Sequence, residues 1–449
     1  MNTMLLGIII FVITYIFIAS EKVDKTIAAM LGAGAMAACG VASFPQMLSK
    51  VDLNVLALLV GMMVIVNIMA TTGVFEWIAV KIAQQTKGNG ILVTIEFLLA
   101  TAVVSAFMDN VTTVILMAPV TILITQLLGI PTVPILILEA IFSNIGGTAT
   151  LVGDPPNILI GASCGLSFND FLFNLTPAVV IIMAVVLVLV VFFLRKQLAT
   201  GASARHAVSL TDASRAILEP KRLRRAMVIF VLVLVGFLTG NMTGIEPGLV
   251  AICGAFLMTL VCGLPISHML EKVEWTTILF FCGLFMVIGA LEINGVFTKL
   301  GELMVQATNG NFALTMMVIL WAGAILSAVV DNIPLVIAMI PLINSIIPVF
   351  AKNMYGIDVP ADYLTQVNYT LPQEVMLHIR EPLFWSLALG ACLGGNGTLI
   401  GASANVVICQ IARKNRYSMT FGNFTAYGAP IMLVSVLISS IYLYIRYIL

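Results

Sequence analysis

The chain has 449 residues, of which 61% are hydrophobic and only 9% are charged, and its formal net charge is zero. Soluble domains carry about a quarter charged residues, so this composition excludes a soluble protein and predicts a polytopic membrane protein. The first apolar run, Leu5 to Ala19, has no basic residue before it and no small-residue cleavage site. We therefore expect a retained helix there rather than a signal peptide.

Hydropathy predicts ten membrane spans, most of them close to the roughly 20 residues that cross a bilayer. In chain order they are 4–19, 27–46, 53–71, 132–164, 174–194, 227–243, 247–264, 275–293, 381–411 and 426–447. Two further hydrophobic pairs flank Asp-Asn dipeptides, namely 91–107 with 111–128 and 311–329 with 333–350. By hydropathy alone, each pair is either two spans or one re-entrant hairpin.

Loop charge decides between these readings. The loop from Arg195 to Arg225 holds eight basic residues against two acidic ones, which predicts a cytoplasmic loop and an N-terminus outside. The acidic segment 352–380 suits the outer face, and the basic run Arg413–Arg416 suits the inner face. All three placements agree only if both pairs are hairpins that return to the side they left.

The chain repeats itself. Ser105–Asn110 recurs as Ser327–Asn332, at an offset of 222 residues, and Gly146–Asn157 recurs as Gly394–Asn405, at an offset of 248. Each half then holds five spans, an odd number, so the two copies lie in opposite orientations. We predict an all-α inverted repeat, with the first repeat at 1–194, a basic cytoplasmic linker at 195–226 and the second repeat at 227–449.

Four interruptions of hydrophobic segments indicate the site. They are the two Asp-Asn hairpin tips and the two glycine-rich breaks at Gly146–Thr150 and Gly394–Thr398. Broken helices at membrane depth survive only where protein or a watery cavity satisfies the backbone, and matching breaks in inverted repeats mark a site near the midplane. We expect the breaks to converge on a cage formed by Asn110, Asn144, Thr148, Thr150, Asn157, Asn332, Asn396, Thr398 and Asn405.

Three carboxylates add charge to this cage. Asp109 and Asp331 are symmetric, whereas Asp154 has Ala402 as its counterpart. An Asp at mid-bilayer costs about 2.5–3.5 kcal/mol and usually marks an ion or proton pathway. We predict that Asp109 and Asp331 bind solute or protons and that all three acids couple transport. Helix-end capping is the alternative for each of them.

Two acids and two cysteines lie in apolar segments without matching partners. For Glu139 and Glu292 a polar packing contact is favoured over a function, and for Cys164 and Cys392 simple burial is favoured over contact with a soft ligand. The three histidines fall in predicted loops, so neither a metal site nor a histidine proton relay is expected.

Three motifs carry a family resemblance: Asp331–Pro334, Gly390–Asn405 and Gly153–Asn157. They resemble the ion transporter superfamily, in the branch that holds the arsenite permeases (ArsB), the NhaD sodium/proton antiporters and the melanosomal P protein, with wording closest to the last. The resemblance implies scaffold helices around a mobile transport part with two hairpins and two broken helices, an elevator-like mechanism and a homodimer. The sequence resembles a bacterial core of this branch, in the inner membrane.

The acids at the predicted site disfavour a dianion, which they repel by about 1 kcal/mol or more per pair. Our first hypothesis is therefore proton-coupled efflux of arsenite and antimonite, and our second is sodium/proton antiport with the same acids. Other ions, chloride included, and a passive channel stay open, while an intramembrane aspartyl protease lacks its expected motifs.

No enzymatic activity, cofactor, metal site or nucleic-acid partner is expected. The chain has no Gly-x-x-x-x-Gly-Lys-Ser/Thr stretch, so any use of ATP would need a partner ATPase subunit.

Overall fold

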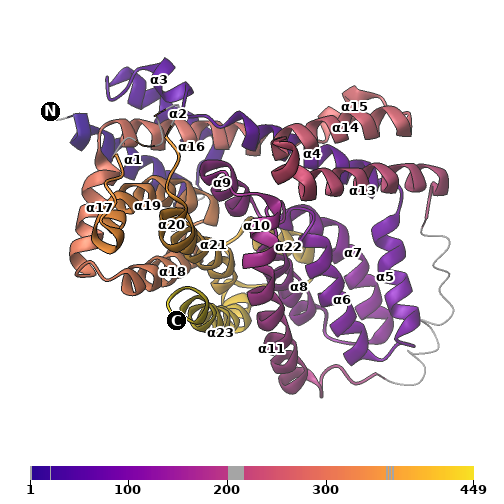
Figure 1. Ribbon diagram of the computed structural model, residues 1–449. Coiled ribbons are helices and arrows are strands. Elements are labelled where there is room, and N and C mark those ends of the chain that lie inside the picture. Colours follow the sequence, from indigo (N-terminus) through magenta and orange to yellow (C-terminus); the bar gives the residue numbers. More distant parts are fainter. Residues whose placement is uncertain (1–2, 21, 201–216, 361–362, 364–365, 367–368) are drawn as a thin grey trace.

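The computed structural model describes residues 3–20, 22–200, 217–360, 363, 366 and 369–449. All regular structure within these residues is helical (Figure 1). The helices of the first half are α1 (Thr3–Ser20), α2 (Lys25–Ala38), α3 (Phe44–Leu48), α4 (Leu53–Ala70), α5 (Val74–Gln85), α6 (Gly90–Ser105), α7 (Asn110–Leu128), α8 (Thr132–Gly147), α9 (Pro155–Cys164), α10 (Phe168–Asn174) and α11 (Thr176–Leu194).

The second half repeats this order with three short additions around its broken helix and with a single helix in place of α10 and α11. Its helices are α13 (Pro220–Thr243), α14 (Pro247–Cys262), α15 (Ile266–Glu271), α16 (Trp275–Ile293), α17 (Val296–Ala307), α18 (Phe312–Val329), α19 (Asn332–Tyr355), α20 (Gln373–Val375), η2 (Met376–Arg380), α21 (Glu381–Gly394), η3 (Gly395–Gly397), α22 (Ser403–Lys414) and α23 (Phe421–Tyr447). The starts of α14, α16, α17, α18 and α19 lie 222 residues after those of α2, α4, α5, α6 and α7.

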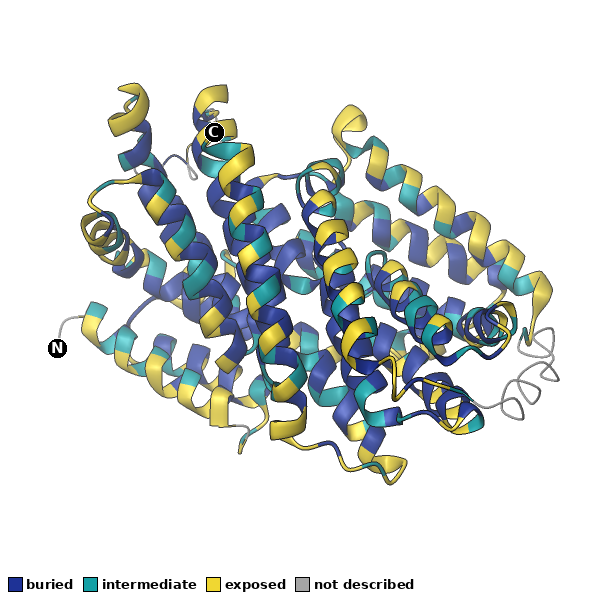
Figure 2. Cartoon of the chain, turned by 90° about the horizontal axis from the view of Figure 1, so that it is seen from below, coloured by how far each residue is buried: buried dark blue, intermediate teal, exposed yellow. Residues whose placement is uncertain are grey.

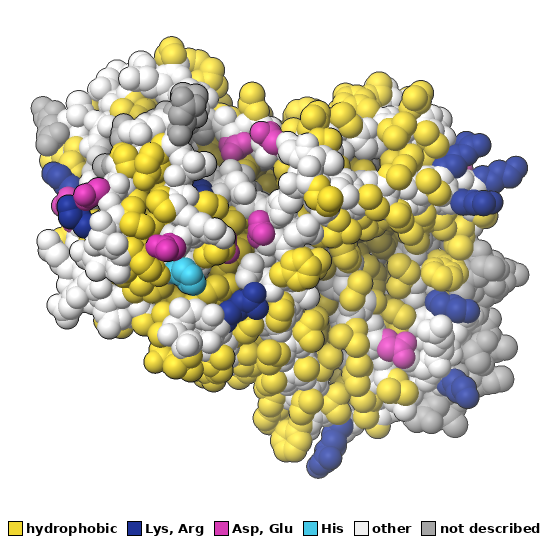
Figure 3. All heavy atoms as spheres, viewed as in Figure 1, with side chains coloured by type: hydrophobic (Ala, Val, Ile, Leu, Met, Phe, Trp, Pro, Cys, Tyr) yellow, Lys and Arg dark blue, Asp and Glu magenta, His cyan; other side chains and the backbone are white. Residues whose placement is uncertain are grey.

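Within the described residues, nine helices are long and apolar enough to cross a membrane. The chain is a multi-pass membrane protein, and its outer helices are apolar because they face lipid rather than water. Figure 2 shows the exposed residues along the outer sides of peripheral helices, with buried residues inside, and Figure 3 shows a broad hydrophobic face with basic side chains near one edge.

The predicted fold class is confirmed, with one correction to its spans. The segment 27–46 does not form one helix, because α2 ends at Ala38 and Gly40 turns the chain with a φ of 70°. At about 1.5 Å per residue, the 14 residues of α2 are shorter than the bilayer core is thick. Helix pairs flank both Asp-Asn tips where the motifs predicted hairpins, α6 with α7 and α18 with α19, and the glycine-rich breaks separate α8 from α9 and α21 from α22. Because α7, α18 and α19 are each long and apolar enough to cross a membrane, the re-entrant course of the hairpins stays a prediction.

The two repeats pack against each other through pairs of helices, one from each repeat. Helix α2 packs on α16 and α14 on α4, while α22 packs on α7 and α9 on α19. Small residues allow the first two pairs to pack closely: a Cβ on Gly61 would meet the carbonyl carbon of Ala251 at 2.5 Å, and one on Gly283 would meet that of Ala29 at 2.9 Å. Both contacts are related by the 222-residue offset, so the α2–α16 and α4–α14 interfaces obey one internal two-fold relation.

The predicted domain boundaries at 194 and 227 stay predictions. Of the linker 195–226, residues 201–216 lie outside the described residues, as do 361–362, 364–365 and 367–368 of the acidic segment.

Candidate functional site

Each hairpin tip ends with an aspartate that caps the second arm. Asp109 accepts hydrogen bonds from the Thr112 backbone N at 2.9 Å and the Thr112 Oγ1 at 2.5 Å. Asp331 accepts one from the Ile333 backbone N at 3.4 Å. Such caps satisfy backbone N–H groups that the helix leaves without partners. Both side chains thus have a structural role, and the roles predicted for them in binding and coupling stay predictions.

The two glycine-rich breaks are tied to the hairpin tips in the same way. The Thr150 hydroxyl donates to the backbone carbonyl of Ala106, and the Thr398 hydroxyl donates to that of Ala328 at 2.5 Å. These ties place each tip level with a break. Helix α9, which follows the first break, has ten residues, or about 15 Å of helix, which is about half the thickness of a bilayer core.

Two asparagines close the breaks from inside. The Asn157 Nδ2 donates to the carbonyls of Thr148 and Thr150 at 3.1 and 2.9 Å, and the Asn405 Nδ2 donates to those of Gly395 and Thr398 at 2.8 and 2.9 Å. Amide side chains therefore replace the backbone partners that the interrupted helices lack.

A chain of buried amides joins the two repeats. The Asn110 Nδ2 donates to the Asn144 Oδ1 at 2.9 Å, and the Asn144 Nδ2 donates to the Oδ1 atoms of Asn396 and Asn405 at 2.9 and 3.1 Å. These four side chains are between 0% and 4% exposed. At the position equivalent to Asn144 the second repeat has Cys392, whose Sγ lies 3.5 Å from the Asn157 Oδ1.

Asp154 lies at the end of this amide chain. It occupies the N-cap position of α9 but makes no capping hydrogen bond, and its side chain is 1% exposed. Its Oδ1 accepts a 3.3 Å hydrogen bond from Asn110. Asn332 and Cys392 lie near the carboxyl group, yet its Oδ2 has no hydrogen-bond partner. Capping, the alternative considered for Asp154, therefore does not explain its burial.

Three polar atoms of this site are buried without a partner. They are one acceptor, the Asp154 Oδ2, and two amide donors, the Nδ2 atoms of Asn332 and Asn396. A buried polar atom left unsatisfied costs about 1–3 kcal/mol. Asn332 lies near the Asp154 carboxyl group, and Asn396 joins the same centre through its hydrogen bond with Asn144. A polar solute that reached these atoms would gain hydrogen bonds.

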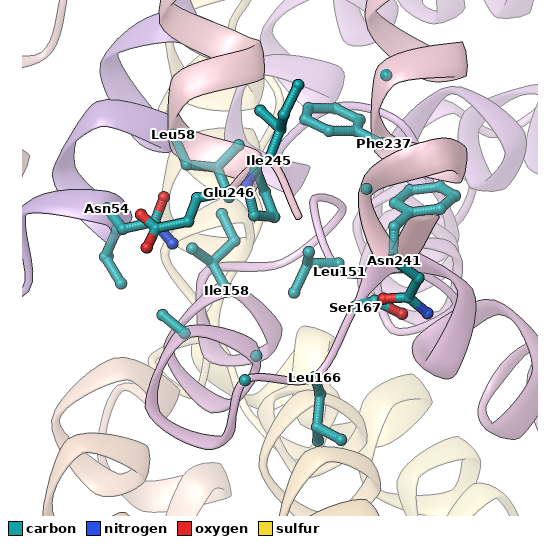
Figure 4. Close-up of a pocket in the computed structure, with 18 of the residues that line it drawn as sticks. Asn54, Leu58, Leu151, Ile158, Leu166, Ser167, Phe237, Asn241, Ile245 and Glu246 are labelled. Carbon is teal, nitrogen blue, oxygen red and sulfur yellow. The ribbon is translucent and has the colours of Figure 1, made fainter. Parts of the chain in front are cut away.

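Two cavities flank this centre at equivalent positions of the two repeats. One, of about 390 Å³, lies between the α1–α2 turn, the second hairpin tip and α22, and Lys25, Asp331 and Ser403 line it. The other, of about 330 Å³, lies between the α13–α14 turn and α9. In Figure 4, Phe237 and Asn241 of α13 line one side of this second cavity, and Glu246 lies beside Asn54. Each cavity borders one broken helix.

Comparison with known proteins identifies the family. Residues 15–368 match the family model described as citrate transporter. The chain belongs to the citrate transporter family. An uncharacterized transporter of Mycobacterium tuberculosis is 40% identical over 445 residues, 98% of each chain. The P protein of Sus scrofa is 32% identical over 518 residues, 97% of this chain but 58% of its own.

A solved structure shares the fold of the transporter. The YdaH transporter of Alcanivorax borkumensis, described as having an unusual topology, matches with a TM-score of 0.58 at 13% sequence identity, over 99% of this chain and 98% of its own. At this identity the likeness supports the fold alone. The P protein and the family agree with the resemblance that the motifs predicted.

Sequence reasoning missed one residue of this transporter, Lys25. Its Nζ lies 3.1 Å from the Asp331 Oδ2 and 3.2 Å from the Ser403 Oγ. The available signal was a lysine at the start of an otherwise apolar segment, although nothing in the sequence named its partner 306 residues away.

The remaining predicted residues differ in their contacts. The Thr148 hydroxyl donates to the Asn144 carbonyl within its own helix at 2.8 Å. Glu292 forms an ion pair with Lys50 at 3.0 Å, as a packing contact would, whereas Glu139 is 1% exposed and neither of its carboxyl oxygens has a partner. Among the described residues, no group of three or more His, Cys, Asp or Glu side chains is arranged to hold a metal ion.

Proposed function

We propose that the transporter exports a small neutral oxyacid, arsenous or antimonous acid, in exchange for protons, by alternating access. The observation that carries this proposal is the set of three unpartnered buried atoms on Asp154, Asn332 and Asn396. They comprise one acceptor and two donors, which matches a solute whose hydroxyl groups both donate and accept. Arsenous acid is such a solute.

Charge argues for a neutral solute over a free polycarboxylate. The family description names citrate, but Asp154 and Asp109 line or adjoin the centre, and Lys25, the cation found beside an acid there, already pairs with Asp331. Like charges 4 Å apart repel by about 1 kcal/mol even at the dielectric constant of water. A solute with several carboxylates would meet that cost at each acid.

Proton coupling is assigned to Asp154. An ionised carboxylate with one unpartnered oxygen is expensive to bury, so protonation lowers the cost of holding this side chain at 1% exposure. A proton that binds there and a solute that uses the same oxygen exclude each other, which is the condition for exchange. Asp109 and Asp331 are proposed to assist as further coupling acids.

Alternating access is supported by the two equivalent cavities and the closed centre between them. The cavities border α9 and α22, while the amides between them are between 0% and 4% exposed. A passive channel needs a continuous opening, whereas a carrier closes its centre as the access changes.

Sodium/proton antiport is the second candidate, and one contact favours it. The ammonium of Lys25 rests on Asp331 inside a cavity, so this carboxylate accommodates a cation. A sodium ion would take oxygen ligands from Asp331 and nearby backbone carbonyls.

The proposal includes a location and an assembly. We place the transporter in a bacterial inner membrane with its N-terminus outside and the 195–226 linker inside, following loop charge. A homodimer is expected from the family resemblance. A partner ATPase subunit is compatible with the proposal, but proton coupling does not require one.

The test is flux in proteoliposomes under an imposed proton gradient. Arsenite, antimonite, sodium and citrate are followed in parallel with the wild type, Asp154→Asn and the matched surface control Glu302→Gln. We expect gradient-driven arsenite accumulation that Asp154→Asn abolishes and Glu302→Gln preserves. Sodium-dependent proton movement without arsenite flux would replace the first candidate by the second, and citrate flux alone would reject both.

A further inference from the structure

The ammonium of Lys25 bridges two elements that belong to different parts of the molecule. It lies 3.1 Å from the Asp331 Oδ2 and 3.2 Å from the Ser403 Oγ, which itself lies 3.1 Å from the same carboxylate oxygen. The ammonium also lies 5.0 Å from the centre of the Phe280 ring. These three contacts of the ammonium fix the position of a side chain that is otherwise flexible.

At the equivalent place beside the first hairpin tip, the aspartate is kept but the ammonium and the hydroxyl group are missing. Lys25 corresponds to Pro247, Asp331 to Asp109 and Ser403 to Pro155. Asp109 is satisfied locally by Thr112. A hairpin tip of this design therefore folds without a neighbouring ammonium, so the fold by itself does not explain Lys25.

The ion pair joins α2, which packs between the repeats, to the second hairpin and the second broken helix. Lys25 begins α2, whose backbone approaches α16 closely at Gly283. Asp331 begins α19, and Ser403 begins α22. Any movement of the hairpin and broken helix relative to α2 must break these contacts.

The pair is also open to ions from one cavity. The Lys25 and Asp331 side chains are 37% and 16% exposed and line the 390 Å³ cavity. The other charged or titratable groups that act on this pair are Asp24 on the same turn, Glu274 before α16, Asp154 and Tyr15 of α1. Acids outnumber the single ammonium here, which favours entry of a second cation.

We propose that Lys25 is a tethered counter-cation that neutralises Asp331 in the empty carrier, holds the second hairpin against α2, and is displaced when a small cation occupies Asp331. The inference rests on the proposed transport function and adds a residue to its coupling. It gives the empty carrier a neutral hairpin tip, so that the return step carries no buried net charge at Asp331.

The test measures the reactivity of Lys25 and needs no transported solute. The purified full-length protein is treated with a small acetylating reagent, and mass spectrometry compares the acetylation rate of Lys25 with that of Lys22. Lys22 is exposed on the same turn and corrects for differences in the reagent between samples. The Lys25/Lys22 ratio is recorded at pH 8 with sodium chloride replacing choline chloride at constant ionic strength.

We expect the ratio to rise about threefold, the protection that a partly exposed ion pair supplies, as sodium replaces choline. In Asp331→Asn the ratio is expected to be high and constant. A wild-type ratio that does not respond to sodium would overturn the proposal, and the wild-type series decides this even if the variant does not fold. Because no flux is measured, a failure of arsenite or sodium transport leaves this result readable.

Discussion

Asn144 of α8 donates a hydrogen bond to Asn396, which lies 252 residues away in the break after α21, at 2.9 Å. This contact joins the broken helix of one repeat to that of the other. Asn144 also accepts from Asn110 and donates to Asn405. It is thus the side chain through which the first hairpin tip and both breaks are connected.

Asn144→Ala is expected to destabilise the protein and abolish transport, because it leaves buried partners of Asn144 unsatisfied at about 1–3 kcal/mol each. The thermal unfolding midpoint in detergent and arsenite flux measure the two effects. The matched control is Cys392→Ala, at the equivalent position, which removes the 3.5 Å contact with Asn157 and the thiol beside the Asp154 carboxyl group but leaves the amide chain intact. Equal losses for the two variants would show that the amide chain has no special role.

Asp109→Asn separates the cap from the charge. Asparagine caps helices about as well as aspartate, so stability should stay within about 0.5 kcal/mol of wild type, whereas Asp109→Ala should cost about 1 kcal/mol. If Asp109 takes part in coupling as predicted, Asp109→Asn loses proton-driven flux despite its intact fold. Full flux in this variant would leave Asp109 with the capping role alone.

Lys25 and Asp331 should be coupled in a double-mutant cycle. Because both side chains are partly exposed, solvent screening limits the expected coupling free energy to about 0.5–1 kcal/mol. The cycle compares Lys25→Gln, Asp331→Asn and the double variant by chemical unfolding in detergent. Additive losses would mean that the 3.1 Å contact contributes nothing to stability.

Gly61→Ala should disrupt the α4–α14 interface. The added Cβ would lie 2.5 Å from the Ala251 carbonyl carbon, and since that atom is backbone the helices must separate, at about 1–3 kcal/mol. Gly34→Ala in α2 is the control, because a Cβ there has no atom within 4 Å and alanine favours helix by about 1 kcal/mol. Yield and unfolding midpoint after purification measure both, and a Gly61→Ala protein as stable as Gly34→Ala would contradict this view of the interface.

The features predicted from sequence are those that depend on local chemistry. Composition required a membrane, glycine-rich segments required breaks, and the copies at Ser105–Asn110 and Ser327–Asn332 required a repeat. The error at 27–46 has a local cause as well, since hydropathy averages over a window and does not register a turn at a single residue such as Gly40.

The sequence by itself thus determined the class of protein, the repeat and the four breaks, because each follows from residues close together in the chain or from a motif that recurs at a constant offset. Only the tertiary structure decided the pairings: Lys25 with Asp331, Asn144 with Asn396, and Asp154 with one oxygen unpartnered. These partners lie up to 306 residues apart, and which of them meet depends on how the helices of the two repeats pack against each other. Hydrogen bonds and ion pairs act over about 3 Å, so their identity emerges only once packing has set the distances.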